Sequence, residues 1–142
     1  MNYILDTNVV SELVAREADQ KVIDWIDSID SESVFLSVIT IGEIKKGIEK
    51  LPDSKRKKTL ASWLEEDLLV RFRGRILPLD IPVLLTWGRL VASLEKEGKP
   101  LPAIDSLLAA TSAQTGFTLV TRNTGDFEPT GISVFDPWKP QA

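Results

Sequence analysis

The stretch Tyr3-Ile4-Leu5-Asp6-Thr7-Asn8-Val9-Val10-Ser11-Glu12 decides the fold, because a short apolar run near the start of the chain ends abruptly at a carboxylate. Such a run is typical of a buried strand, and the polar residues after it are typical of a helix start. Asp6 is therefore predicted at the carboxyl end of a strand, the edge of an open α/β sheet where ligands bind. The alternative is that Asp6, or Asn8, only caps a short helix over residues 9–14.

The composition limits the chemistry that this chain can perform. Its 142 residues, 43% of them hydrophobic, are enough for one domain with its own core, and one domain over residues 1–142 is expected. The chain has no cysteine and no histidine, which excludes disulfides, thiolate metal sites and a histidine base. Neither a signal peptide nor a membrane-spanning run is recognisable, so a cytoplasmic protein without membrane contact is expected. The net charge of -4 argues against a general polyanion binder.

Short apolar runs alternate with segments of helical spacing along the chain. Strands are predicted within residues 3–5, 33–38, 75–79, 117–120 and 132–135, and helices between them. In the helix that begins at Asp80, the side chains expected to face inward are Val83, Leu84, Trp87, Val91 and Leu94. The alternation predicts an α/β fold, a three-layer sandwich in which helices cover both faces of a parallel sheet of about five strands.

Carboxylates follow several of these strands or open the next helices. Asp6, Glu43, Asp105 and the turn 123–126 all fall at the same expected edge of the sheet. Two carboxylates about 5 Å apart would repel each other by roughly 3 kcal/mol at an effective dielectric constant of about 20, so such a cluster favours a divalent cation. Oxygen ligands suit Mg²⁺ or Mn²⁺, which can activate water for attack on a phosphoryl group.

Two of these carboxylates also have a purely structural interpretation. Glu43 stands three residues after Thr40, as in a capping box that would open a helix at Thr40. Asp105 lies in the first turn of a predicted helix, where the helix dipole favours a negative charge. The residues alone leave both interpretations open.

Four motifs, in register, resemble those of a known family. They are Tyr3-Ile4-Leu5-Asp6-Thr7-Asn8, Ser37-Val38-Ile39-Thr40-Ile41-Gly42-Glu43-Ile44, the segment 104–113 that begins Ile104-Asp105-Ser106, and Val120-Thr121-Arg122-Asn123-Thr124-Gly125-Asp126-Phe127. Together with the ending Phe135-Asp136-Pro137-Trp138, they resemble the motifs of PIN-domain ribonucleases. The likeness is greatest to the VapC toxins of bacterial toxin–antitoxin pairs, including the FitB-like branch, and it spans nearly the whole chain.

The resemblance implies a PIN-like fold and a Mg²⁺-dependent endoribonuclease. Asp6, Glu43 and Asp105 would form the acidic core and hold the metal, with Thr7, Asn8 and Thr121 in supporting positions. It also implies that a VapB-type antitoxin inhibits the protein and that only the antitoxin contacts operator DNA. Relatives are usually homodimers that assemble further with antitoxin.

The fourth acidic position departs from the family pattern. Relatives often carry an acid at the position of Asn123, and this chain has its next acid three residues later, at Asp126. Because Gly125 makes the turn flexible enough to fold back, we predict that Asp126 supplies the fourth carboxylate and that Asn123 orients it. The alternative is that Asp126 only caps the following segment.

A basic region interrupts this acidic chain around Pro52. Its members are Lys45, Lys46, Lys50, Lys55, Arg56, Lys57 and Lys58. Some of these side chains are expected to contact RNA phosphates, and the alternative is a solvated helix face. The chain also has four tryptophans, at positions 25, 63, 87 and 138, which either pack in the core or serve an interface with a partner.

Three other functions fit these residues less well. A dinucleotide-binding domain would need a Gly-x-Gly-x-x-Gly turn where this chain has Asp6-Thr7-Asn8. A phosphatase with an aspartyl nucleophile would want a second acid at the position of Asn8. A degenerate PIN domain that binds RNA or a partner without cutting is supported only by Asn123.

Overall fold

The computed structural model describes residues 1–140, so the last two residues of the predicted domain, 141 and 142, lie outside the described part of the chain. Its elements follow one another as repeated units of a short strand and one or more helices. They are β1 (Tyr3–Leu5), α1 (Thr7–Leu13), α2 (Gln20–Ser28), η1 (Ser31–Ser33), β2 (Val34–Ser37), α3 (Val38–Glu49), α4 (Lys55–Ser62), η2 (Trp63–Leu68), α5 (Leu69–Arg71), β3 (Ile76–Leu77), α6 (Ile81–Lys96), α7 (Ala103–Thr115), β4 (Thr118–Val120), η3 (Thr124–Thr130) and β5 (Val134–Phe135).

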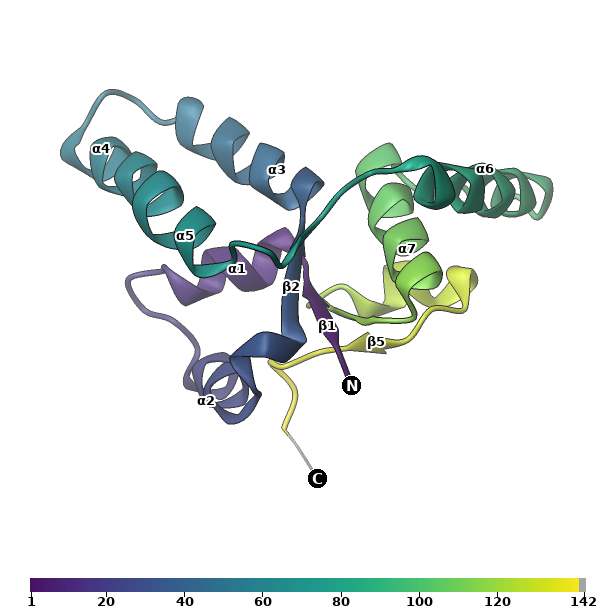
Figure 1. Cartoon of the computed structure of the whole chain (residues 1–142), viewed down its shortest axis with the longest axis horizontal. Coiled ribbons are helices and arrows are strands. Elements are labelled where there is room, and N and C mark those ends of the chain that lie inside the picture. The colour runs from purple at the N-terminus through teal and green to yellow at the C-terminus, as the bar shows by residue number, and fades with distance from the viewer. Residues whose placement is uncertain (141–142) are drawn as a thin grey trace.

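A single sheet separates two groups of helices. Within residues 1–140 it has five strands in the order β3-β2-β1-β4-β5, and every neighbouring pair is parallel. Figure 1 shows α1 to α5 on one side of the sheet and α6 and α7 on the other. The predicted α/β fold, with a parallel sheet between two helical layers, is confirmed.

The central strand β1 is buried because its successive residues serve both faces of the sheet. Leu5 belongs to the apolar cluster that α1 to α5 form with the sheet, and Ile4 belongs to the cluster on the side of α6 and α7. Neighbouring side chains of a strand point to opposite faces, so both positions must be apolar in a strand covered twice. Leu119 of β4, Phe127 of η3 and Ala109 of α7 complete the buried part of the second cluster.

The carboxyl ends of the three central strands meet at one edge of the sheet. Asp6 follows β1, Ser37 ends β2 and Thr121 follows β4. The backbone N–H of Asp6 donates to the carbonyl of Val120 at 2.9 Å, which fixes the register at this edge. Because α1 and α3 begin directly after their strands, their first turns lie at the same edge.

Two helix starts differ from the predictions. The helix α1 begins at Thr7, since Asp6 is its N-cap and accepts a hydrogen bond from the Thr7 N–H at 2.7 Å. The helix α3 begins three residues earlier than predicted, because Ser37 caps it by accepting a hydrogen bond from the Ile39 N–H. Thr40 is therefore a buried residue inside α3, and the predicted capping box between Thr40 and Glu43 was wrong.

The other differences lie in the helical layers. The helical stretch predicted ahead of the strand at residues 75–79 is three segments after Asp53, because the six residues of η2 form a π-helix between α4 and α5. Leu84 was predicted to face inward but is 44% exposed, since α6 buries the stripe that runs from Val83 to Leu94. Among the helices of residues 1–140, none combines the length and the apolar character needed to cross a bilayer.

Candidate active site

Asp6 is the centre of a hydrogen-bonded network at this edge of the sheet. Its side chain is buried, one carboxylate oxygen accepts the Thr7 N–H at 2.7 Å, and the other accepts the Thr121 hydroxyl at 2.8 Å. Burial raises the pKa of Asp6 above its ordinary value, and the charge of Glu43 adds to this, while the two hydrogen bonds oppose it. The carboxylate is thus held in one orientation at an electrostatic cost.

Glu43 reaches the same network from α3. The Thr7 hydroxyl donates to Glu43 Oε1 at 2.6 Å, while the backbone N–H of Thr7 donates to Asp6. Thr7 therefore links the two carboxylates, which come from neighbouring strand ends, through a single residue. This contact holds the Glu43 side chain at the edge of the sheet. The predicted capping box would instead have turned that side chain toward its own helix.

A second layer of polar groups fixes the Thr121 hydroxyl. Its oxygen accepts hydrogen bonds from Asn8 Nδ2 at 3.3 Å and from the Asn123 N–H at 3.1 Å. With both lone pairs occupied, the hydroxyl proton is left to donate to Asp6. The structure thus places Asn8, Thr121 and the backbone of Asn123 behind Asp6, as supporting positions would require.

Asp105 and Asp126 face the same region from the other helical layer. Asp105 lies in the first turn of α7 and is partly buried, and burial is the largest cause that raises its pKa. The next causes are the negative charges of Asp6, Asp126 and Glu43, in that order. Asp126 lies in η3, where its N–H donates to the carbonyl of Asn123 at 3.1 Å. The structure therefore makes the four predicted carboxylates electrostatic neighbours.

The donor set of this cluster suits a hard divalent cation. Among residues 1–140, the ion pairs are formed by other carboxylates, and no lysine or arginine pairs with any of the four acids. In this conformation no three of the acidic residues described are arranged to share one metal ion. Mg²⁺ is usually bound through one or two carboxylates and keeps several waters, so the arrangement fits Mg²⁺ better than an ion that needs an all-protein cage.

The charge cluster has a measurable consequence for stability. In metal-free protein, Asp105→Asn is expected to raise the melting temperature by a few degrees at neutral pH, because it removes a carboxylate that burial and three like charges disfavour. The folded pKa of Asp105 lies above its ordinary value of 3.8, so its contribution to stability is greatest below that pH and is lost as the pH rises through the folded pKa.

Thermal unfolding as a function of pH tests this expectation. The difference between wild type and Asp105→Asn should vanish in acid and grow toward neutral pH. Added Mg²⁺ should stabilise the wild type more than the variant, because ligands stabilise the state that binds them. A variant less stable than wild type at every pH would show that Asp105 is not under electrostatic strain.

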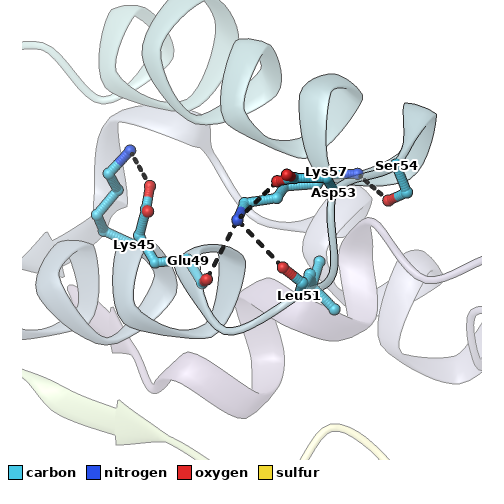
Figure 2. Close-up of polar contacts among 6 residues, drawn as sticks. All are labelled: Lys45, Glu49, Leu51, Asp53, Ser54 and Lys57. Atoms are coloured by element: carbon cyan, nitrogen blue, oxygen red, sulfur yellow. Dashed lines mark hydrogen bonds and ion pairs between the residues drawn. The ribbon is translucent and has the colours of Figure 1, made fainter.

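The basic region is only partly free to meet RNA. Figure 2 shows Lys57 turned toward the end of α3, where its ammonium donates to the carbonyls of Glu49 at 3.2 Å and Leu51 at 3.1 Å. It also pairs with Asp53 at 3.7 Å, and Lys45 pairs with Glu49 at 3.0 Å. Lys57 thus closes the turn between α3 and α4, since a lysine can satisfy the last carbonyls of a helix. Within residues 1–140, the exposed members without such contacts are Lys46, Lys50, Lys55, Arg56 and Lys58.

This division can be measured with two changes that each remove one positive charge. Lys57→Gln is expected to lower the free energy of unfolding by about 1–2 kcal/mol, because the hydrogen bonds from a charged group to the carbonyls of Glu49 and Leu51 are lost. The neighbouring change Lys58→Gln should leave stability unchanged and weaken RNA binding, with a smaller dependence on salt. Denaturant unfolding and RNA titrations at two salt concentrations separate the effects. If neither variant alters RNA affinity, this part of the basic region is a solvated face.

A groove runs from the acids between α1, α3 and α4. It has a volume of about 280 Å³, and Thr7 and Glu43 line it together with Gly47, Arg56 and Trp63. The remaining lining residues are Ser11, Val14, Ile44, Ile48, Leu51 and Leu60. Arg56, predicted to bind RNA, thus lies in a largely apolar groove that the sequence did not reveal.

The four tryptophans are all partly buried. Trp25 contacts the rings of Tyr3 and Phe135 at the rim of the larger cluster, and Trp138 lies under the guanidinium of Arg122 at 5.1 Å. The other two are Trp63, in the groove, and Trp87, which donates to the Ser106 hydroxyl at 2.9 Å. None of the four is fully buried, so the alternative that all of them pack in the core does not describe them; that some serve an interface stays a prediction.

The comparisons with known proteins agree with this geometry. The family model of the PIN domain matches residues 3–131. The chain belongs to the PIN-domain family. Toxin FitB of Neisseria gonorrhoeae is 39% identical to this PIN domain over 95% of the chain and 97% of its own length. VapC ribonuclease Y4jK of Sinorhizobium fredii is 37% identical over 96% of the chain and 98% of its own length.

Solved structures show the same PIN fold. A structure of FitAB bound to a DNA fragment has a TM-score of 0.93 and 37% identity, and it covers 99% of this chain and 98% of that one. The structure of FitAcB from Neisseria gonorrhoeae has a TM-score of 0.92 and 38% identity, with 97% and 99% covered. The predicted resemblance to FitB-like VapC toxins is confirmed.

Proposed function

We propose that this chain, acting as one PIN domain over residues 1–142, is a metal-dependent endoribonuclease and the toxin of a toxin–antitoxin pair. The observation that carries the proposal is the gathering of Asp6, Glu43, Asp105 and Asp126 around one edge of the sheet. Relatives that align over nearly the whole chain bear the names of a toxin and a ribonuclease, which supports the same function.

Asp6 and Asp105 would hold Mg²⁺ or Mn²⁺ directly, and Glu43 and Asp126 would contact the waters that the ion keeps. Once bound, the ion supplies a Lewis acid for a phosphoryl oxygen and lowers the pKa of a nearby water. The chain's own residues provide preorganisation: the Thr7 and Thr121 side chains hold Asp6 and Glu43 in fixed orientations before substrate arrives. Little rearrangement is then needed when RNA binds.

RNA cleavage in the presence and absence of metal tests the proposal. Purified chain without antitoxin is expected to cut cellular RNA with Mg²⁺, to stop in excess chelator and to resume when Mn²⁺ is added. Cleavage that persists in chelator would contradict metal dependence. RNA that is bound but never cut would instead favour the degenerate PIN domain.

The fourth carboxylate can be assigned by two reciprocal changes. We propose that Asp126 fills this position, since it adds to the electrostatic strain on Asp105 and is anchored through its N–H to the Asn123 carbonyl. Asp126→Asn is expected to raise the Mg²⁺ concentration needed for half-maximal cleavage by about tenfold. The measurement is a Mg²⁺ titration of the cleavage rate.

The reciprocal variant distinguishes the alternative. If Asp126→Asn leaves the Mg²⁺ requirement unchanged while Asn123→Asp tightens metal binding, the vacant fourth position belongs to Asn123. In that case Asn123 and Asp126 are linked through their backbones, by the hydrogen bond from the Asp126 N–H to the Asn123 carbonyl, and not through the Asn123 side chain.

We further propose that a VapB-type antitoxin seats an apolar segment in the groove between α1, α3 and α4. The groove is largely apolar yet ends at Thr7 and Glu43, so a segment bound in it would cover the acids. FitB is named a toxin, and the similar solved structures are of FitAB bound to a DNA fragment and of FitAcB, which supports a partner protein and a DNA contact in the assembly. We propose that the antitoxin makes this DNA contact.

A homodimer is proposed on the opposite layer. Three large apolar side chains on the first half of α6 are exposed: Ile81, Leu84 and Leu85. Burying such a patch against a second copy would remove it from water. Sedimentation of the antitoxin-free chain at micromolar concentration tests this association.

A further inference from the structure

A second cleft opens beside the acids, between the loop that joins α6 to α7 and the helix η3. Its volume is about 400 Å³, and Asp105 and Asp126 both line it. The groove described above is lined by α1, α3 and α4, in the helical layer on the other side of the sheet. Thr7 and Glu43 therefore line one depression, and Asp105 and Asp126 line the other. Nothing in the metal site or the antitoxin groove requires this second cleft.

The lining of the cleft combines rigid apolar surface with charge of both signs. Leu101 and three prolines supply the apolar part, and prolines offer no N–H that must be satisfied. Lys99 lines the same cleft and forms no ion pair within residues 1–140, so its ammonium is available to a phosphate. The volume lies within the range of small-ligand sites, which are mostly apolar with a few polar groups.

We propose that this cleft, named here the nucleoside cleft, holds one nucleoside of the RNA beside the scissile phosphate. The proposal rests on the proposed ribonuclease function and adds where the enzyme selects its cleavage site. Sequence-specific proteins usually read RNA bases that have left the stack. A base against Leu101 and the prolines would set its own phosphodiester next to Asp105 and Asp126, because these acids line the same cleft.

Gly125 lines the cleft without a side chain, so a larger residue at this position can be used to block the cleft. A Cβ built at Gly125 meets no atom within 4 Å, and its φ lies outside the left-handed region. A larger side chain there would therefore project into open space without straining the backbone. Substitution at Gly125 should fill the cleft and leave the core unchanged.

The experiment uses the full chain in the Asp6→Asn background, which binds RNA without consuming it. A fluorescent RNA hexanucleotide pool of mixed sequence is titrated in Mg²⁺ against Gly125→Ala and Gly125→Leu. The affinity is expected to fall with side-chain volume, by about tenfold for Gly125→Leu. Ala113→Leu, an exposed change at the far end of α7, is the matched control and should bind like its parent. In the active protein, Leu101→Ala should redistribute the cleavage sites on a mixed-sequence RNA.

The outcomes separate this proposal from the ribonuclease function. Equal RNA affinity for Gly125→Leu and its parent, with both proteins folded by circular dichroism, overturns the nucleoside cleft. If Gly125→Leu does not fold, Leu101→Ala decides, and an unchanged affinity and cleavage pattern overturn the proposal. Graded loss of affinity in a protein that never cuts RNA supports the cleft while the ribonuclease function fails. Loss of antitoxin binding with RNA affinity intact assigns the cleft to the antitoxin and overturns the proposal.

Discussion

Asp6→Asn is expected to lower RNA cleavage by about a thousandfold or more. A metal that acts as a Lewis acid contributes several kcal/mol to transition-state stabilisation, and each 1.4 kcal/mol is a factor of about ten in rate. Asp6 is the acid most firmly held at the sheet edge, by Thr7 and Thr121, so its charge cannot be replaced by a small shift of a neighbour. Single-turnover cleavage of a defined RNA measures the loss.

The matched control is Asp27→Asn, the same chemical change on the exposed surface of α2. It should cut RNA at the wild-type rate. The Asp6→Asn protein should remain folded but somewhat less stable, because its new amide N–H would face the Thr121 hydroxyl, whose lone pairs are already used. If folded Asp6→Asn cleaves RNA at a rate within a factor of about ten of the wild-type rate, Asp6 is not a ligand of the metal.

Gly47→Leu is expected to weaken antitoxin inhibition by about a hundredfold, through a steric block that adds no charge. Gly47 lines the groove, and a Cβ there meets no atom within 4 Å, so the leucine side chain would occupy space proposed for the antitoxin. Replacing a glycine inside a helix also gains about 0.8–1 kcal/mol of helix propensity, so the variant should be more stable as well as resistant. The measurement is residual RNA cleavage during titration with the antitoxin encoded by the neighbouring reading frame.

Gly42→Leu supplies the control for this variant. It makes the same change in the same helix, at an exposed glycine outside the groove, and it should gain the same stability while remaining fully inhibited. Equal inhibition of the Gly42 and Gly47 variants would show that the antitoxin segment does not enter the groove.

The strands and the acidic positions could be predicted because their signals are local. An apolar run that ends at Asp6 specifies both a buried strand and a carboxylate at its end. The parallel topology then brings Glu43 and Asp105 to the same edge, since the carboxyl ends of parallel strands share one side of the sheet. The pattern of strands therefore predicted where these carboxylates lie, although the residues alone left a purely structural role open for Glu43 and Asp105.

The details that the sequence did not reveal depend on competition between similar residues or on distant contacts. Ser37 and Thr40 are both good caps, and the length of β2 decides between them, which no local pattern reports. Lys57 resembles its basic neighbours in sequence, but its ammonium contacts the carbonyls of Glu49 and Leu51 at the end of α3 (Figure 2). The link from Thr7 to Glu43 spans 36 residues and follows from tertiary packing.

The groove and the nucleoside cleft were missed for the same reason. Each is bounded by elements that are separate in sequence, α1 with α3 and α4 in one case and the loop before α7 with η3 in the other. Gly47 and Gly125 were the available signals. A glycine inside a helix, or beside a functional turn, often marks a place where another molecule must come close.

The central claim is that the carboxylates at this sheet edge bind a divalent cation for phosphodiester cleavage. Anomalous diffraction from a crystal soaked in Mn²⁺, at a concentration that supports RNA cleavage in solution, tests it most directly. The expected result is a manganese peak about 2.0–2.3 Å from carboxylate oxygens of Asp6 and Asp105. Asp126 or Glu43 is expected to bind the same ion, either directly or through a water. An anomalous map without a peak at this edge, from protein that cuts RNA at the same Mn²⁺ concentration, would contradict the account.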